Sequence, residues 1–147
     1  MNTHPDFEEL LRLIENHDVD YMIVGGYAVA YHGYPRFTKD IDLFFDSSEQ
    51  NSIRLRTALI EFGFSESELA LESFTTMGNV LTFGAEPTRV DLLNDIDGVT
   101  FEEASSNIVS GTYGSVSVRF IGFDDLIKNK NATPRARDKG DVEELTE

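Results

Sequence analysis

The sequence predicts one globular domain of the α/β or α+β class, and three observations support this. Helical and strand-like hydrophobic patterns alternate along the chain. The chain has 147 residues, which is long enough for one domain with a buried core. Hydrophobic residues make up 40% and aromatic residues 11%, as in globular rather than disordered proteins. We therefore expect a single domain over residues 1–147.

The first quarter of the chain alternates between helix and strand. Apolar residues recur at helical spacing in residues 6–17, after a proline, and predict a helix there. An apolar run over residues 19–24 predicts a strand that ends at Gly25 and Gly26. A short helix is expected over residues 27–32, because a glycine and then a proline follow it.

A second strand and a longer helix are expected next. Residues 39–45 alternate and are rich in large apolar side chains, which predicts a strand. A helix is then expected to begin at a cap within residues 46–48 and to end near Phe62, where Gly63 stops it. Residues 64–78 give no clear pattern.

The second half of the chain contains three strand signals and two helix signals. The predicted strands span residues 79–83, 88–93 and 115–121, with turn-like residues at 84–87 and 112–114. Helices are expected over residues 123–131 and from about 135 to 145. Residues 94–98 resemble part of a calcium loop, but Leu93 and Ala104 stand where that loop needs acids. We therefore interpret residues 94–98 as a turn.

The charge of the chain restricts its partners. Asp and Glu total 27 against 12 Lys and Arg, which gives a formal net charge of −15. Such a surface repels extended DNA or RNA, whereas a small anionic ligand can bind where a metal ion or a basic patch offsets the field. The chain has no cysteine and three scattered histidines, so no zinc site is expected.

The sequence also indicates the compartment. No apolar run approaches the roughly 20 residues that a membrane-spanning helix needs. The first ten residues lack the basic and apolar regions of a signal peptide. We therefore expect a soluble, cytoplasmic protein without a membrane partner.

Two acids in the strand over residues 39–45 are the first candidate site. Asp40 and Asp42 share one face of that strand, roughly 7 Å apart along the backbone, and the opposite face is apolar. Two carboxylates so close repel each other, and a cation that neutralises them relieves the repulsion. Such a pair suits Mg²⁺, which favours oxygen ligands and shares its remaining positions with phosphates. The alternative is a half-exposed strand with a polar face.

Two further features favour a site for a phosphate compound. Gly25 and Gly26, at a strand end before a helix, allow a ligand to approach the backbone closely. Asp91 lies among apolar residues in the strand over residues 88–93 and is a candidate third carboxylate. The alternatives are a tight turn for the glycines and an exposed strand residue for Asp91.

The C-terminal tail is the most basic part of the chain. It carries Lys128, Lys130, Arg135, Arg137 and Lys139. We expect these bases to offset the charge of a triphosphate, with Lys130 or Arg135 reaching phosphate. Nucleotide contacts are also expected just before the acid pair, from Arg36, Thr38 and Lys39. The alternative is a solvated loop whose arginines pair with Asp138, Asp141 and Glu143.

The order of these motifs resembles the nucleotidyltransferase superfamily related to DNA polymerase beta. The resemblance is carried by residues 24–43, by Asp91, and by the tail segments 123–130 and 135–141. It is closest to the small bacterial and archaeal members, which include minimal nucleotidyltransferases and the toxin components of abortive-infection systems. It implies a mixed sheet flanked by helices.

The resemblance also implies a reaction. A nucleoside monophosphate would pass from an NTP, with ATP favoured, to an acceptor hydroxyl, and pyrophosphate would be released. Asp40 and Asp42 would hold one or two Mg²⁺ ions, and Asp91 would complete the metal site and could help to deprotonate the acceptor. Gly25 and Gly26 would lie under the phosphates.

One departure from the family pattern leaves an alternative open. Many members carry a serine where this chain has Gly26, so the hydroxyl contact to phosphate is lost here. The alternative is a weak or inactive module that binds nucleotide or a partner protein in a toxin–antitoxin-like role. The three acids favour an enzyme. The acceptor is left open between a protein hydroxyl, a tRNA end and a small molecule.

Overall fold

A computed structural model of the protein describes residues 3–34, 38–85 and 88–146. The strands are β1 Tyr21–Val24, β2 Asp40–Phe45, β3 Val80–Ala85, β4 Thr88–Leu93, β5 Val109–Tyr113 and β6 Val116–Phe120. The helices are α1 Pro5–Asn16, α2 Gly25–Tyr31, α3 Glu49–Phe62, the 3-10 turn η1 Glu66–Glu68, α4 Glu72–Thr75, α5 Phe101–Ser105, α6 Phe123–Ala132 and α7 Ala136–Thr146.

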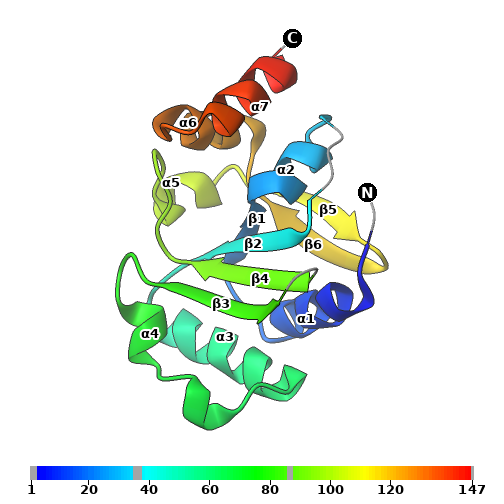
Figure 1. Ribbon diagram of the computed structural model, residues 1–147. Helices are drawn as coiled ribbons and strands as arrows, with labels where there is room; N and C mark the ends of the chain where they lie inside the picture. The colour runs from blue at the N-terminus through cyan, green and yellow to red at the C-terminus, as the bar shows by residue number, and fades with distance from the viewer. Residues whose placement is uncertain (1–2, 35–37, 86–87, 147) are drawn as a thin grey trace.

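The strands form one mixed sheet in the order β3-β4-β2-β1-β6-β5. The pairs β3–β4, β2–β1 and β6–β5 are antiparallel, whereas β2–β4 and β1–β6 are parallel. Helices lie above and below this sheet in Figure 1. The expected α/β (α+β) class with a mixed sheet flanked by helices is therefore confirmed.

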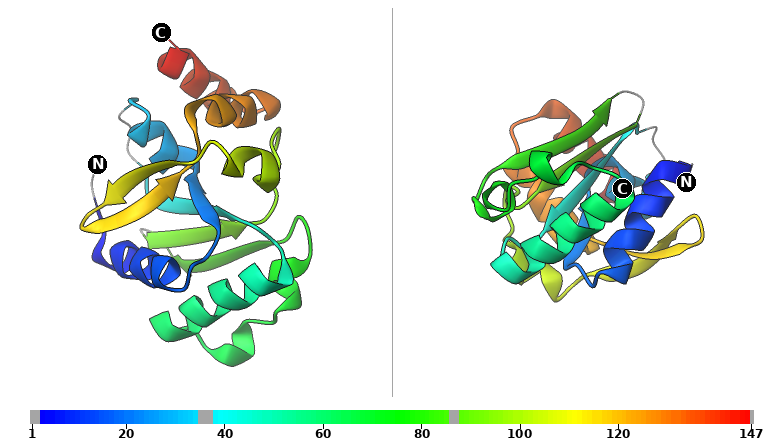
Figure 2. Two further views of the ribbon diagram at one scale, coloured as in Figure 1. Left: turned by 180° about the vertical axis from the view of Figure 1, so that it is seen from behind. Right: turned by 90° about the horizontal axis from the view of Figure 1, so that it is seen from below.

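The helices divide between the two sides of the sheet. Helices α1 and α3 lie side by side below it, as the right view of Figure 2 shows. Helices α2, α6 and α7 lie on the other side, and α7 packs along α6. The central strand β1 is buried at every position, as expected for a strand covered on both faces. No helix in the described ranges is long and apolar enough to cross a membrane.

Local signals explain most of the element boundaries. The Ser48 side chain accepts a hydrogen bond from the Asn51 N–H and caps α3, and Gly63 with φ +130° ends that helix. The expected cap within residues 46–48 is thereby confirmed. The residues without a clear pattern, 64–78, contain only η1 and α4.

Besides η1 and α4, two short elements were not predicted, α5 and β5. Helix α5 has five residues, too few for a periodic pattern, although Thr100 and Glu103 form a capping box at its start. Strand β5 is an edge strand interrupted by Gly111, which weakens the strand signal. The expected turn at 112–114 is wrong in part, because Thr112 and Tyr113 pair with β6. The expected turn at 84–87 is wrong in part, because Gly84 and Ala85 belong to β3, and residues 86 and 87 lie outside the described residues.

Candidate functional site

The parallel pairing of β2 and β4 brings the predicted acids together. In this register Asp42 lies opposite Asp91, and Asp40 lies opposite Arg89. Neighbouring residues on paired strands point to the same face, so the three carboxyl groups share one side of the sheet. The carboxyl groups of Asp42 and Asp91 are in hydrogen-bonding contact.

The environment of Asp42 favours its protonated form. Burial raises the pKa of Asp42 to about 7, and the negative charge of Asp91, the hydrogen bond to Asp91 and the charge of Asp40 act in the same direction. The nearby ammonium group of Lys130 opposes this shift. Near neutral pH, Asp42 is therefore protonated in a large part of the molecules.

An arginine that the sequence analysis did not select links the acids. Nη2 of Arg89 lies 3.0 Å from Oδ2 of Asp40 and 3.2 Å from Oδ2 of Asp91. The Thr82 hydroxyl donates to Oδ1 of Asp91 at 2.8 Å, so both oxygens of that carboxylate are held. Strand alternation could have identified Arg89, because it is two residues before Asp91 and therefore on the same face.

The two glycines have different neighbours. Gly25 has φ +69°, and a Cβ atom there would lie 2.2 Å from Oδ2 of Asp42, so this position requires glycine. A Cβ atom on Gly26 would lie 2.7 Å from the hydroxyl oxygen of Thr38. That hydroxyl donates to the carbonyl of Asp40 at 3.2 Å. The absence of a serine at position 26 thus has a steric reason in this chain.

The acids offer oxygen ligands to a hard cation. Oδ1 of Asp40 is buried and has no hydrogen-bond partner within the described part of the chain. Buried carboxylate oxygens of this kind gain from a cation. In the same described part, no three His, Cys, Asp or Glu side chains are already arranged so that they could hold one metal ion. We attribute this to Arg89, which lies between Asp40 and Asp91 and contacts both.

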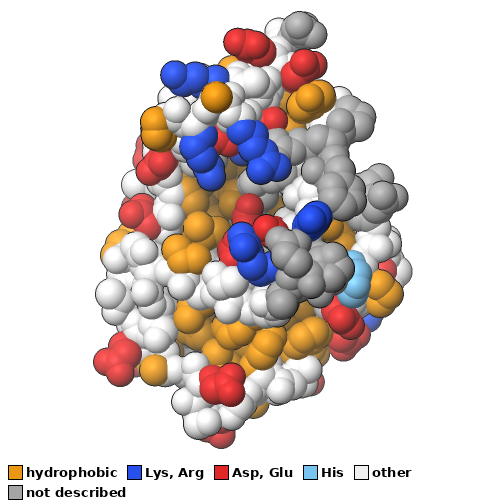
Figure 3. Space-filling model, in the orientation of Figure 1, with side chains coloured by type: hydrophobic (Ala, Val, Ile, Leu, Met, Phe, Trp, Pro, Cys, Tyr) orange, Lys and Arg blue, Asp and Glu red, His pale blue; other side chains and the backbone are white. Residues whose placement is uncertain are grey.

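The acids lie in a cleft of about 390 Å³, which is within the usual size range of small-molecule sites. Figure 3 shows acidic side chains inside a hollow with Lys and Arg side chains around it. The cleft is lined by Val24, Gly25, Asp40, Asp42, Arg89, Asp91, Leu93, Asp95, Ile96, Asp97, Asn129, Lys130, Thr133, Arg135 and Arg137.

One wall of the cleft is the segment that follows β4. Asn94 is buried, donates to the carbonyls of Phe74 and Thr76, and accepts from the N–H of Gly78. The side chain of Asn129 on α6 donates to the carbonyl of Asp97 at 2.8 Å. These contacts fix the segment as a turn, as expected. The sequence analysis did not assign its acids to the site, because only the fold places them beside β2.

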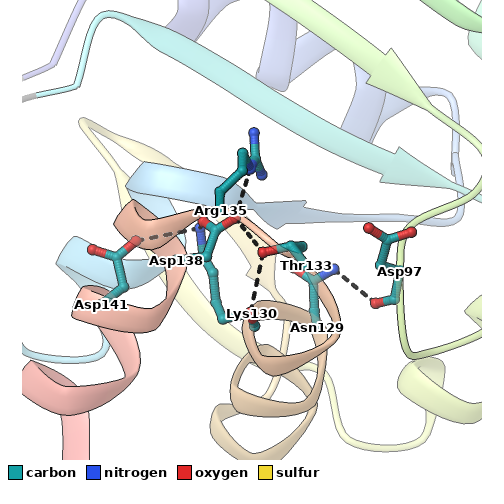
Figure 4. A network of polar contacts seen from close by, with 7 residues as sticks. All are labelled: Asp97, Asn129, Lys130, Thr133, Arg135, Asp138 and Asp141. Carbon is teal, nitrogen blue, oxygen red and sulfur yellow. Dashed lines mark hydrogen bonds and ion pairs between the residues drawn. The ribbon is translucent and has the colours of Figure 1, made fainter.

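The opposite wall is formed by the C-terminal tail (Figure 4). Nζ of Lys130 lies 2.8 Å from Oδ1 of Asp138 and 3.4 Å from Oδ2 of Asp141. Nε of Arg135 donates to Oδ2 of Asp138 at 2.7 Å. Lys130 is 5% exposed, so its ammonium group is enclosed between two buried carboxylates.

The predicted nucleotide contacts divide into three groups. Of the described candidates, Gly25, Lys130 and Arg135 line the cleft, whereas Gly26, Thr38 and Lys39 do not. Arg36 lies outside the described residues. Lys130 and Arg135 also pair with Asp138. For Arg135, the alternative interpretation of the tail expected such a pair. Whether any of these residues contacts a nucleotide stays a prediction.

Comparison with known proteins gives one result. A family model described as "Nucleotidyl transferase of unknown function (DUF2204)" matches residues 3–147, nearly the whole chain. No curated protein matches the sequence.

Proposed function

Because the chain belongs to this family of nucleotidyl transferases, we propose that it is a Mg²⁺-dependent enzyme that transfers a nucleoside monophosphate from an NTP to an acceptor hydroxyl. ATP is the nucleotide that we favour. The family match supports the reaction class, and the metal, the nucleotide and the acceptor are our proposals.

One observation carries the proposal. Asp42 and Asp91 are in contact and Asp40 is linked to Asp91 through Arg89, inside a cleft that also contains basic residues. Two features favour a divalent cation at this point: repulsion between the carboxylates, and Oδ1 of Asp40, which is buried and has no hydrogen-bond partner among the described residues. When bound, Mg²⁺ would neutralise the acids and polarise the phosphate that is attacked.

The residues of the chain would then orient and neutralise the reactants. An acceptor oxygen forms a bond to the α-phosphorus while the bond to the α,β-bridging oxygen breaks, and pyrophosphate leaves. The proton of the acceptor hydroxyl passes to a carboxylate, for which we propose Asp91. Lys130 and Arg135 would face the β- and γ-phosphates from the tail.

The test uses NTPs labelled at different phosphates. The purified protein is incubated with Mg²⁺, a lysate of the source organism and each of the four NTPs, labelled at the α- or the γ-phosphate. Nucleotidyl transfer predicts that the α-label becomes attached to an acceptor and that the γ-label appears in pyrophosphate. Asp91→Asn should abolish the transfer. The charge-matched control is Asp18→Asn. Asp18 is an exposed acid after α1, and its backbone angle φ of +55° is one that asparagine also adopts.

The other results separate the alternatives. Attachment of the γ-label would indicate a kinase and contradict the proposal. Metal-dependent binding of NTP without transfer of either label would support the alternative of a nucleotide-binding regulatory module. Transfer by Asp91→Asn at the rate of the parent would show that the three acids are not the site.

A further inference from the structure

Asp138 accepts three hydrogen bonds from one wall of the cleft. Its Oδ1 accepts from Nζ of Lys130 at 2.8 Å, and its Oδ2 accepts from the Thr133 hydroxyl at 2.5 Å and from Nε of Arg135 at 2.7 Å. The residue is 2% exposed. Burial opposes its charge, but the hydrogen bonds from Lys130, Thr133 and Arg135 hold the pKa of Asp138 below its usual value. The carboxylate is therefore charged at neutral pH.

This carboxylate connects two helices at the point where the chain turns. Lys130 belongs to the last turn of α6, and Asp138 belongs to the first turn of α7. Thr133 and Arg135 lie in the connection between them and donate to the same oxygen. A single buried acid thus sets the position of two basic residues that line the cleft.

The contact with Asp138 orients Arg135 without enclosing it. The side chain of Arg135 remains 70% exposed. A guanidinium group has five N–H donors in a planar fork, and Asp138 uses the one on Nε. Figure 4 shows the end of this side chain pointing away from α7 and toward the sheet. Its terminal nitrogens are thus presented on the side of the cleft.

We propose that Asp138 is a positioning residue that presents Lys130 and Arg135 together to the β- and γ-phosphates of the nucleotide. The proposal rests on the function proposed above and deepens it, because it assigns the recognition of the triphosphate to one carboxylate-held pair. A planar fork held at Nε can bind phosphate through its two terminal nitrogens, which a lysine cannot do.

A purely structural role for Asp138 predicts a different result. Removing a buried charge that accepts three bonds lowers stability in either case. Only the positioning role predicts that the effect of Asp138 on phosphate affinity depends on the presence of Arg135. The two roles therefore differ in the coupling between these residues rather than in the stability of the variants.

The main test is a double-mutant cycle on phosphate binding. Asp138→Asn, Arg135→Gln and the double variant are titrated with inorganic tripolyphosphate, ATP and AMP in the calorimeter, with Mg²⁺ present and at a temperature where circular dichroism shows every variant folded. We expect each single variant to bind tripolyphosphate and ATP about tenfold more weakly. The double variant should lose much less than the product of the two effects, and AMP binding should not change.

Two further variants keep the test decisive if Asp138→Asn does not fold. Arg135→Lys changes an exposed residue and keeps its charge but removes the fork, so we expect nearly the full loss of Arg135→Gln. Asp141→Asn is the matched control, because it removes a partner of Lys130 but none that Arg135 is seen to use. Asp141→Asn should therefore lower stability, but it should weaken tripolyphosphate binding less than Asp138→Asn does.

The outcomes distinguish this proposal from the proposed function. Additive losses in the double variant, or parent-like affinity in Arg135→Lys, would overturn the role of Asp138 while label transfer by the parent still stands. Coupled losses without any label transfer would support the role of Asp138 and contradict the transferase. A parent that binds neither tripolyphosphate nor ATP would overturn both.

Discussion

Replacing Asp42 with asparagine should stabilise the metal-free protein at alkaline pH. The pKa of Asp42 is about 7 in the folded protein against an ordinary value of 3.8. Between these values the folded chain holds a proton that the unfolded chain releases, so stability falls as pH rises through this window. Above pH 7 the penalty is complete, and below the ordinary value it vanishes. An asparagine carries no charge and can donate to Asp91, as protonated Asp42 does.

The size of the effect follows from the pKa shift. Each pKa unit corresponds to about 1.4 kcal/mol, so a rise from 3.8 to about 7 sets an upper limit of about 4 kcal/mol. Asp42 lies beside an open cleft, where solvent reduces the realised penalty. We therefore expect Asp42→Asn to gain about 2 kcal/mol over the parent above pH 7.

Urea unfolding followed by circular dichroism measures this gain. The parent and the variant are compared in the presence of a chelator from about pH 4 to about pH 8.5, a range that spans the two pKa values. The difference should be near zero at the acidic end and grow with pH. Asp18→Asn, the remote exposed control, should show no such growth. Added Mg²⁺ should raise the stability of the parent and leave that of Asp42→Asn unchanged.

Two results would refute this reasoning. A variant that is less stable than the parent at every pH would show that Asp42 has a structural role. Equal stabilisation of the parent and the variant by Mg²⁺ would show that the cation binds elsewhere.

Two other substitutions have definite expectations. Gly25→Ala should displace Asp42 and abolish Mg²⁺-dependent nucleotide binding, measured by titration calorimetry. The control is Gly33→Ala, which is also at positive φ but has open space around it. This control should lower stability, measured by scanning calorimetry, and keep nucleotide binding. Lys130→Ala should lower the free energy of unfolding by about 3–5 kcal/mol, measured by urea titration, because it leaves two buried carboxylates uncompensated. The control Lys128→Ala changes an exposed lysine and should lower that free energy by at most about 0.5 kcal/mol. A Lys130 variant as stable as the Lys128 variant would show that the buried pair contributes nothing.

The sequence predicted the strands that carry the acids because their patterns are local. Alternation in residues 39–45 placed Asp40 and Asp42 on one face, and β2 has that pattern of burial. The pairing of Asp42 with Asp91 could not be derived in this way. It depends on the parallel register of two strands separated by more than forty residues, which tertiary packing determines.

The tail shows a second limit of sequence reasoning. Its bases were recognised from composition, but composition does not reveal which carboxylate each one meets. Asp138 and Asp141 are three residues apart and share one face of α7, so both can reach Lys130 on α6. Only the packing of α7 along α6 decides this, and it pairs Lys130 and Arg135 with acids.

The balance of charge in the cleft predicts that the proposed binding of metal and of nucleotide would be interdependent. Among the described residues, five acids line the cleft against four bases, namely Asp40, Asp42, Asp91, Asp95 and Asp97 against Arg89, Lys130, Arg135 and Arg137. Arg89, Lys130 and Arg135 already pair with carboxylates, so a triphosphate that enters alone meets uncompensated negative charge. A divalent cation bound to the acids would attract the phosphates. The phosphate oxygens would in turn supply the cation with ligands in addition to the carboxylates. By linkage each would raise the affinity of the other by the same factor. In a chain of net charge −15, this coupling would explain how an acidic protein could bind the anionic substrate that we propose.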